Sequence, residues 1–113
     1  MLKAGKLGCA EACYNLGYSY DTGYGVEIDK KKAKYYWELA AIKGNVNARH
    51  NIGTVERNAG NYERAMKHYI IAAKSGGKES LHNVKLAYMD KIVTKDEYAS
   101  TLRAHQQRLD EMK

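Results

Sequence analysis

The sequence of 113 residues contains no proline and no phenylalanine, and only 10 of its residues are glycine. Because proline interrupts helices and glycine favours turns, this composition argues against a loop-rich fold and permits long helices. No apolar run reaches the roughly 20 residues that a membrane span needs. The opening residues, MLKAGKLGCA, also lack the apolar centre of a secretory signal. We therefore expect no membrane partner and a cytoplasmic location.

Cysteine is scarce, and charge is not concentrated. Cys9 and Cys13 are the only cysteines; their spacing does not suit a disulfide within a helix, and two thiols are too few for zinc. We expect buried thiols, which fit a reducing compartment. The net charge is +6, but the basic residues are spread along the chain apart from residues 30–34. Since Ala33 interrupts that run at a helical core position, a solvated helix face is favoured over a nucleic-acid patch.

The sequence does contain an internal repeat, which indicates stacked structural units. One set of residues recurs 36 positions later: Ala12, Asn15, Leu16 and Gly17 as Ala48, Asn51, Ile52 and Gly53. A second set recurs 32 positions later: Ala33, Trp37, Ala40, Ala41 and Gly44 as Ala65, Tyr69, Ala72, Ala73 and Gly76. A third, weaker copy begins at Ser80, Asn83 and Val84.

Each copy has the spacing of two helices. Apolar residues recur with the period of a helix, and Gly44 and Gly76 stand where a left-handed helix end is expected. Asp29, Asn61 and Thr94 are predicted N-caps, and Thr94 with Glu97 forms a capping box. The first helices are expected near 10–22, 46–58 and 78–90, and the second helices near 29–43, 61–75 and 94–112. The predicted fold is all-α: an α-solenoid of antiparallel helix pairs, a tetratricopeptide-like superhelix of about three repeats.

The repeat also predicts the domain organisation. The whole chain, residues 1–113, is one repeat domain, with repeats at 9–44, 45–76 and a divergent third at 77–113. The segment AGKLG at 4–8 matches the ends of the second helices, so residues 1–8 are interpreted as the tail of a truncated repeat. In the third repeat Lys85 replaces the glycine, and His105 and Gln106 stand near the lost alanine pair. We expect that end to be a polar cap.

The stretch AEACYNLGYSYDTGYGVEIDKKKAKYYWELAAIKG resembles a Sel-one-like repeat, whose pattern is A-x2-N-L-G-x2-Y-x2-G-x-G-V-x2-D-x3-A-x2-Y-x3-A-A-x2-G. The second copy has the shorter turn NAGNYERA and is closer to the related tetratricopeptide repeat. The resemblance implies an α-solenoid that acts as an adaptor or scaffold for other proteins. It implies no catalytic chemistry.

Residues that could support catalysis or bind metal do not form a recognisable pattern. The candidate side chains are Cys9, Cys13, His50, His68, His82 and His105, and neither G-x-S-x-G nor a phosphate loop accompanies them. His50 and His82 occupy the same place in adjacent repeats, but helix packing separates such positions by about 10 Å, and a third ligand is missing. We therefore predict no enzyme activity, no cofactor and no metal site.

The leading functional hypothesis is a scaffold that binds a protein or peptide on the concave face formed by the first helices. By match to the tetratricopeptide pattern, that face comprises Glu11, Tyr14, Asn15, Tyr18, His50, Asn51, Thr54, Arg57, His82 and Asn83. Asn15, Asn51 and Asn83 would form a column that grips a peptide backbone, or would only join neighbouring helices. The alternative function is binding of RNA or single-stranded nucleic acid through lysine and tyrosine. Self-association through the first repeat is a further expectation.

Overall fold

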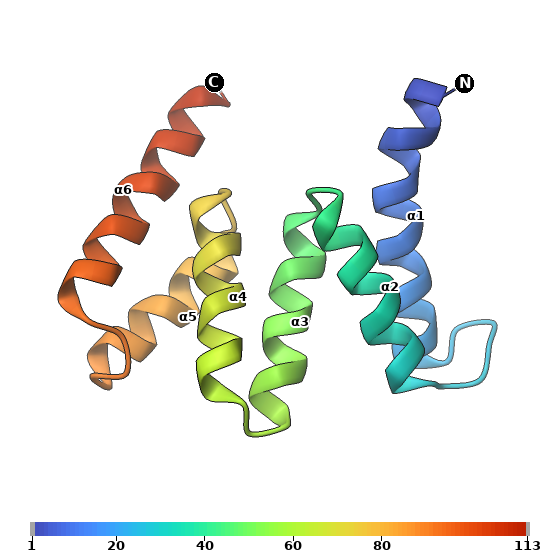
Figure 1. The fold of residues 1–113 in the computed structure, drawn as a ribbon, viewed down its shortest axis with the longest axis horizontal. Helices are drawn as coiled ribbons and strands as arrows, with labels where there is room; N and C mark the ends of the chain where they lie inside the picture. Colours follow the sequence, from blue (N-terminus) through green and yellow to red (C-terminus); the bar gives the residue numbers. More distant parts are fainter. Residues whose placement is uncertain (1, 113) are drawn as a thin grey trace. The chain divides into compact units, whose positions relative to one another are not determined.

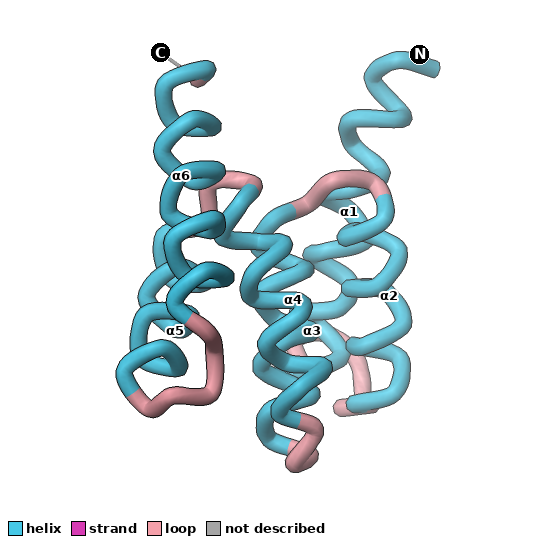
Figure 2. Tube along the Cα trace, turned by 60° about the vertical axis from the view of Figure 1, so that its left-hand side comes forward, coloured by secondary structure: helices cyan, strands magenta, loops and turns pink. Residues whose placement is uncertain are grey.

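The computed structural model describes residues 2–112, with side chains from Cys9 onward. In this part of the chain helices alternate with short turns, and no strand occurs (Figures 1 and 2). The helices are α1 (Leu2–Thr22), α2 (Lys30–Ile42), α3 (Val46–Asn58), α4 (Tyr62–Lys74), α5 (Lys78–Met89) and α6 (Lys95–Glu111). The predicted all-α class is confirmed, and the five helices after α1 begin and end within one residue of their expected positions.

The start of α1 was predicted wrongly. It begins at Leu2 rather than near residue 10, so AGKLG lies inside a helix and does not end one at Gly8. The equivalent segment before α3 ends in Asn45, whose side-chain oxygen accepts a hydrogen bond from the Ala48 amide at 2.8 Å and starts the new helix. Cys9 stands 36 residues earlier and has no such oxygen. A glycine within a helix costs only about 1 kcal/mol, so the helix continues through Gly8.

The other predicted helix ends are mostly confirmed. Asp29 accepts hydrogen bonds from the amides of Lys31 and Lys32, both at 3.1 Å. Thr94 forms the capping box with Glu97. Gly44 and Gly76 adopt the left-handed backbone, with φ of 97° and 103°. Asn61 is the exception: it occupies the N-cap position, but its side chain caps no amide.

By its contacts the chain divides after Ile52, within α3, into two units that are described separately. In the first unit α1 packs beside α2 (Figure 1). Gly17 permits this approach, because a Cβ atom there would lie 2.5 Å from Nε1 of the buried Trp37. The same indole nitrogen donates a hydrogen bond to the Tyr14 carbonyl at 3.2 Å. A residue without a side chain at this crossing thus lets the two helix axes approach closely.

The second unit uses the same arrangement between α3 and α4. A Cβ atom at Gly53 would lie 2.8 Å from Cε1 of Tyr69, which is completely buried. The hydroxyl groups of Tyr69 and Thr54 are 2.8 Å apart and share a hydrogen bond. Tyr69 belongs to the core of this unit, whose other members come from α4, α5 and the turn after α5: Ala65, Ala73, Val84, Ala87 and Val93.

The third repeat replaces both members of the glycine–aromatic pair. Lys85 and Thr101 lie 32 residues after Gly53 and Tyr69. Lys85 is exposed, whereas Thr101 is fully buried and donates a hydrogen bond to the Glu97 carbonyl at 2.7 Å. His105 takes the position of Ala73; it is only 6% exposed, and its Nδ1 donates to the Ala73 carbonyl at 2.9 Å. His105 therefore joins α6 to the end of α4 and does not face solvent as part of a polar cap.

The expectation of buried thiols is wrong for Cys9, which is exposed, while Cys13 is partly buried. The neighbouring Ala12 is exposed, and Leu16 is 41% exposed. The equivalent residues of α3 are buried instead: Ala48 is 0% exposed and Ile52 is 2% exposed. Sequence equivalence predicted core positions in both helices, but in α1 this side of the helix is open to solvent.

Candidate binding face

In the first unit, the predicted binding residues of α1 lie on one side of the helix. Glu11, Asn15 and Tyr18 are exposed, and Tyr14 is partly buried. At 100° per residue these positions fall within an arc of about 100°, centred roughly 110° away from Gly17. The exposed side chains of Glu11, Asn15 and Tyr18 therefore point away from the contact between Gly17 and Trp37. From α3, His50 and Asn51 belong to the same unit and are partly buried.

In the second unit, two predicted binding residues are already engaged within the protein. The Thr54 hydroxyl bonds to that of Tyr69, and the Arg57 guanidinium lies 6.0 Å from the centroid of the Tyr69 ring. A cation at this distance from an aromatic face is attracted to it. His82 is exposed, whereas Asn83 is partly buried. Thr54 and Arg57 thus help to hold Tyr69, while His82 is open to solvent.

The proposed asparagine column stays a prediction. Asn15 and Asn51 lie in the first unit and Asn83 in the second. Their surroundings also differ, since Asn15 is exposed and the other two are partly buried. A ligand could reach Asn15 more easily than it could reach Asn51.

Sequence reasoning missed two residues beside this set. Leu86 and Met89 stand 32 residues after Thr54 and Arg57, and they are 44% and 65% exposed. The repeat offset would have found them if it had been applied to every predicted binding position. Thr54 and Arg57 have polar groups that suit ligand contacts, whereas Leu and Met side chains in a helix suggest the hydrophobic core.

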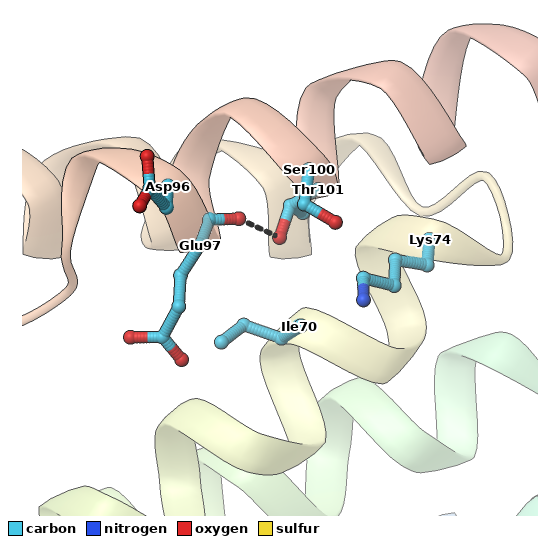
Figure 3. A pocket seen from close by; sticks show the side chains of 6 residues that line it. All are labelled: Ile70, Lys74, Asp96, Glu97, Ser100 and Thr101. Carbon is cyan, nitrogen blue, oxygen red and sulfur yellow. Dashed lines mark hydrogen bonds between the residues drawn. The ribbon is translucent and has the colours of Figure 1, made fainter.

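A pocket of about 260 Å³ opens between α4 and α6 (Figure 3). Ile70 and Lys74 line it from α4, and Asp96, Glu97, Ser100 and Thr101 line it from α6. Glu97 belongs to the capping box, and its carbonyl accepts from Thr101. The pocket therefore lies on the second helices of repeats two and three, and none of the predicted binding residues lines it. Part of its polar lining serves to start α6.

The alternative nucleic-acid function would draw on an aromatic cluster in the first unit. The rings of Tyr20 and Tyr36 are stacked with centroids 5.7 Å apart, and Tyr35 meets Tyr36 edge-on at 5.2 Å. The Lys32 ammonium lies 5.3 Å from the Tyr20 centroid. Tyr35 is 56% exposed. The cluster thus combines an accessible ring with a nearby cation on α2.

Two absences concern only the described part of the chain. Within it, no three His, Cys, Asp or Glu side chains are placed to hold a metal ion. No helix in residues 2–112 combines the length and apolar character that crossing a bilayer requires.

Comparison with known proteins gives two findings. The family model described as the Sel1 repeat matches residues 10–45 and 49–77. A sel1-like repeat-containing protein of Acanthamoeba polyphaga mimivirus is 37% identical over 62 residues, which is 55% of this chain and 12% of that protein. The chain therefore spans only a small part of this relative's length.

Proposed function

Because the chain belongs to the Sel1 repeat family, we propose that it is a scaffold that binds a peptide or protein partner on the first helices of its repeats. Repeats of this family generally mediate protein–protein interaction, and they are structural rather than catalytic units. The face and the partner are the parts of the proposal that go beyond the family.

The observation that carries the proposal is the exposed side of α1. Tyr18 is 54% exposed there, beside the exposed Glu11 and Asn15. Tyrosine combines a large contact area with a polar group, and it is enriched where proteins bind one another. Asparagine can both donate to and accept from a peptide backbone. This side of α1 therefore offers what a peptide needs, without disturbing the contact between Gly17 and Trp37.

A photo-crosslinking experiment tests the face. Tyr18 on α1 and Tyr35 on α2 have nearly equal exposed fractions, 54% and 56%, so each is a matched control for the other. Each tyrosine would be replaced in turn by the photoreactive benzoylphenylalanine, and the protein irradiated in an extract of its source cell. We expect a discrete protein adduct from position 18 and none from position 35.

The same experiment separates the two functional hypotheses. If positions 18 and 35 crosslink the same proteins with equal yield, the contacts are non-specific and the proposed face is contradicted. A nuclease-sensitive adduct from position 35 would instead favour nucleic-acid binding, because Tyr35 belongs to the aromatic cluster beside Lys32.

A further inference from the structure

The outward side of α5 combines basic and apolar residues. Lys78, His82, Lys85, Leu86 and Met89 are all exposed, and at 100° per residue they share an arc of about 100°. We call this set the α5 stripe. The buried residues of the helix, Ser80, Val84 and Ala87, lie on the opposite side. The stripe is therefore a helix face that the core of the second unit does not use.

The charge of the α5 stripe has one sign. Both lysines lie toward one edge of the arc and Leu86 lies at the other edge, with Met89 and His82 between them. The nearest carboxylate, that of the exposed Glu79, falls about 20° beyond Leu86, outside the arc. Lys85 is accessible because the third repeat lacks the close glycine–aromatic contact of the second: the equivalent Gly53 is covered by Tyr69. The stripe is thus particular to this repeat.

We propose that the α5 stripe docks an acidic amphipathic helix of the partner, an inference that rests on the proposed scaffold function. Its apolar anchors would cover Leu86 and Met89, and its carboxylates would pair with Lys78 and Lys85. His82, Leu86 and Met89 follow the i, i+4, i+7 spacing along about 10 Å of helix, the spacing at which an amphipathic helix presents its own anchors. The flexible side chain of Met89 can adapt to different apolar groups.

The side chains favour this partner over a nucleic acid. The imidazole of His82 is the one ring of the stripe on which a base could stack, whereas proteins that bind single strands stack successive bases on several aromatic side chains. The tyrosine of this helix, Tyr88, is stacked on Tyr98 with ring centroids 4.7 Å apart and is partly buried. Because a stripe on one helix presents a small area, the contact is expected to be weak and transient.

Three synthetic peptides labelled with fluorescein test the proposal. The first places leucine at i, i+3, i+4 and i+7 with glutamate at the remaining positions. The second has lysine in place of glutamate, and the third has serine in place of leucine. Fluorescence anisotropy with the full chain in about 100 mM salt should show the first peptide binding at least about tenfold tighter than the other two.

Variants then locate the binding. Leu86→Ser with Met89→Ser should weaken the acidic peptide about tenfold, and Lys78→Glu with Lys85→Glu should reverse the preference between the acidic and basic peptides. Ile71 on α4 is 46% exposed, close to the 44% of Leu86, so Ile71→Ser with Lys67→Glu is the matched control. This control should leave the affinity unchanged. Circular dichroism confirms that each variant is folded.

The inference is overturned if the acidic peptide does not bind, if the basic peptide binds equally well, or if the α4 control loses as much affinity as the α5 variant. Its failure is distinct from failure of the scaffold function, because the crosslink at Tyr18 does not involve α5. A protein adduct at Tyr18 without acidic-peptide binding would remove only this inference.

Discussion

At the scale of single residues, the glycine positions were readable from the sequence because two copies of the repeat preserve them. Gly17 and Gly53 recur with Trp37 and Tyr69, and the structure places each aromatic ring where a Cβ atom would stand. The roles of Thr54 and Arg57 were not readable. Both had the chemistry of ligand contacts, but only the three-dimensional structure shows that they surround Tyr69.

Replacing the second glycine should destabilise the protein. In Gly53→Ala the new Cβ atom would meet the buried Tyr69 ring, and overpacking of this kind costs about 1 to 3 kcal/mol. That exceeds the gain of up to about 1 kcal/mol from the better helix propensity of alanine. Urea denaturation should therefore show a lower free energy of unfolding. Lys85→Ala at the equivalent exposed position is the control, with a change below about 0.5 kcal/mol; equal losses in both variants would contradict the explanation.

Substitution of Asn51 distinguishes a role in peptide binding from a role in joining neighbouring helices. Asn51→Ala should weaken a partner peptide identified by crosslinking by about 1 to 3 kcal/mol, the usual consequence of leaving a buried polar partner unpaired. Titration calorimetry measures this change, and the melting temperature should shift little. If instead the melting temperature falls strongly and the affinity is unchanged, Asn51 joins helices and does not contact the peptide.

At the scale of the helix, the sequence predicted boundaries well wherever the capping residue was recognisable. Asp29 and Thr94 begin their helices through side-chain hydrogen bonds. The prediction failed at the start of α1 because it relied on the similarity of AGKLG to later helix ends. It ignored Cys9, which cannot cap as Asn45 does.

Thr94 caps its helix with a side-chain hydrogen bond and Asn61 does not, so substitutions at these two N-cap positions can be compared directly. Thr94→Ala removes a side-chain hydrogen bond to the Glu97 amide and should lower the free energy of unfolding by about 1 kcal/mol. Asn61 occupies the N-cap position of α4, but Asn61→Ala removes no capping hydrogen bond. Its effect should stay within about 0.5 kcal/mol. Thermal and urea unfolding measure both, and an Asn61→Ala variant as unstable as Thr94→Ala would show that Asn61 caps its helix in solution.

At the scale of the whole molecule, the repeat offsets of 36 and 32 residues predicted which helices pair, since each offset repeats a complete packing pattern. They did not predict which sides stay exposed. Exposure depends on neighbours in space: Ile52 and Leu16 hold equivalent positions, yet only Ile52 is buried.

Self-association through α1 stays a prediction of the sequence, and it can now be assigned to particular side chains. Cys9, Ala12 and Leu16 form an exposed apolar side of the helix, and exposed patches of this kind favour association. Light scattering after size exclusion should show a mass that rises with protein concentration. Leu16→Glu should give a monomer, and Ile42→Glu, at an exposed residue of α2, should not. A chain that stays monomeric at high concentration would exclude the association.

The paired exchange of Gly53 and Tyr69 for Lys85 and Thr101 has a consequence for engineering. Moving α5 alone into the place of α3 would set the Lys85 side chain against the Tyr69 ring, where even one added carbon atom is too many. Moving α6 alone into the place of α4 would leave Thr101 beside Gly53 and open a void. Chimeras that graft α5 together with α6 avoid both faults. The transferable module of this protein is therefore the helix pair, and a library built by shuffling single helices would combine mismatched faces of this kind.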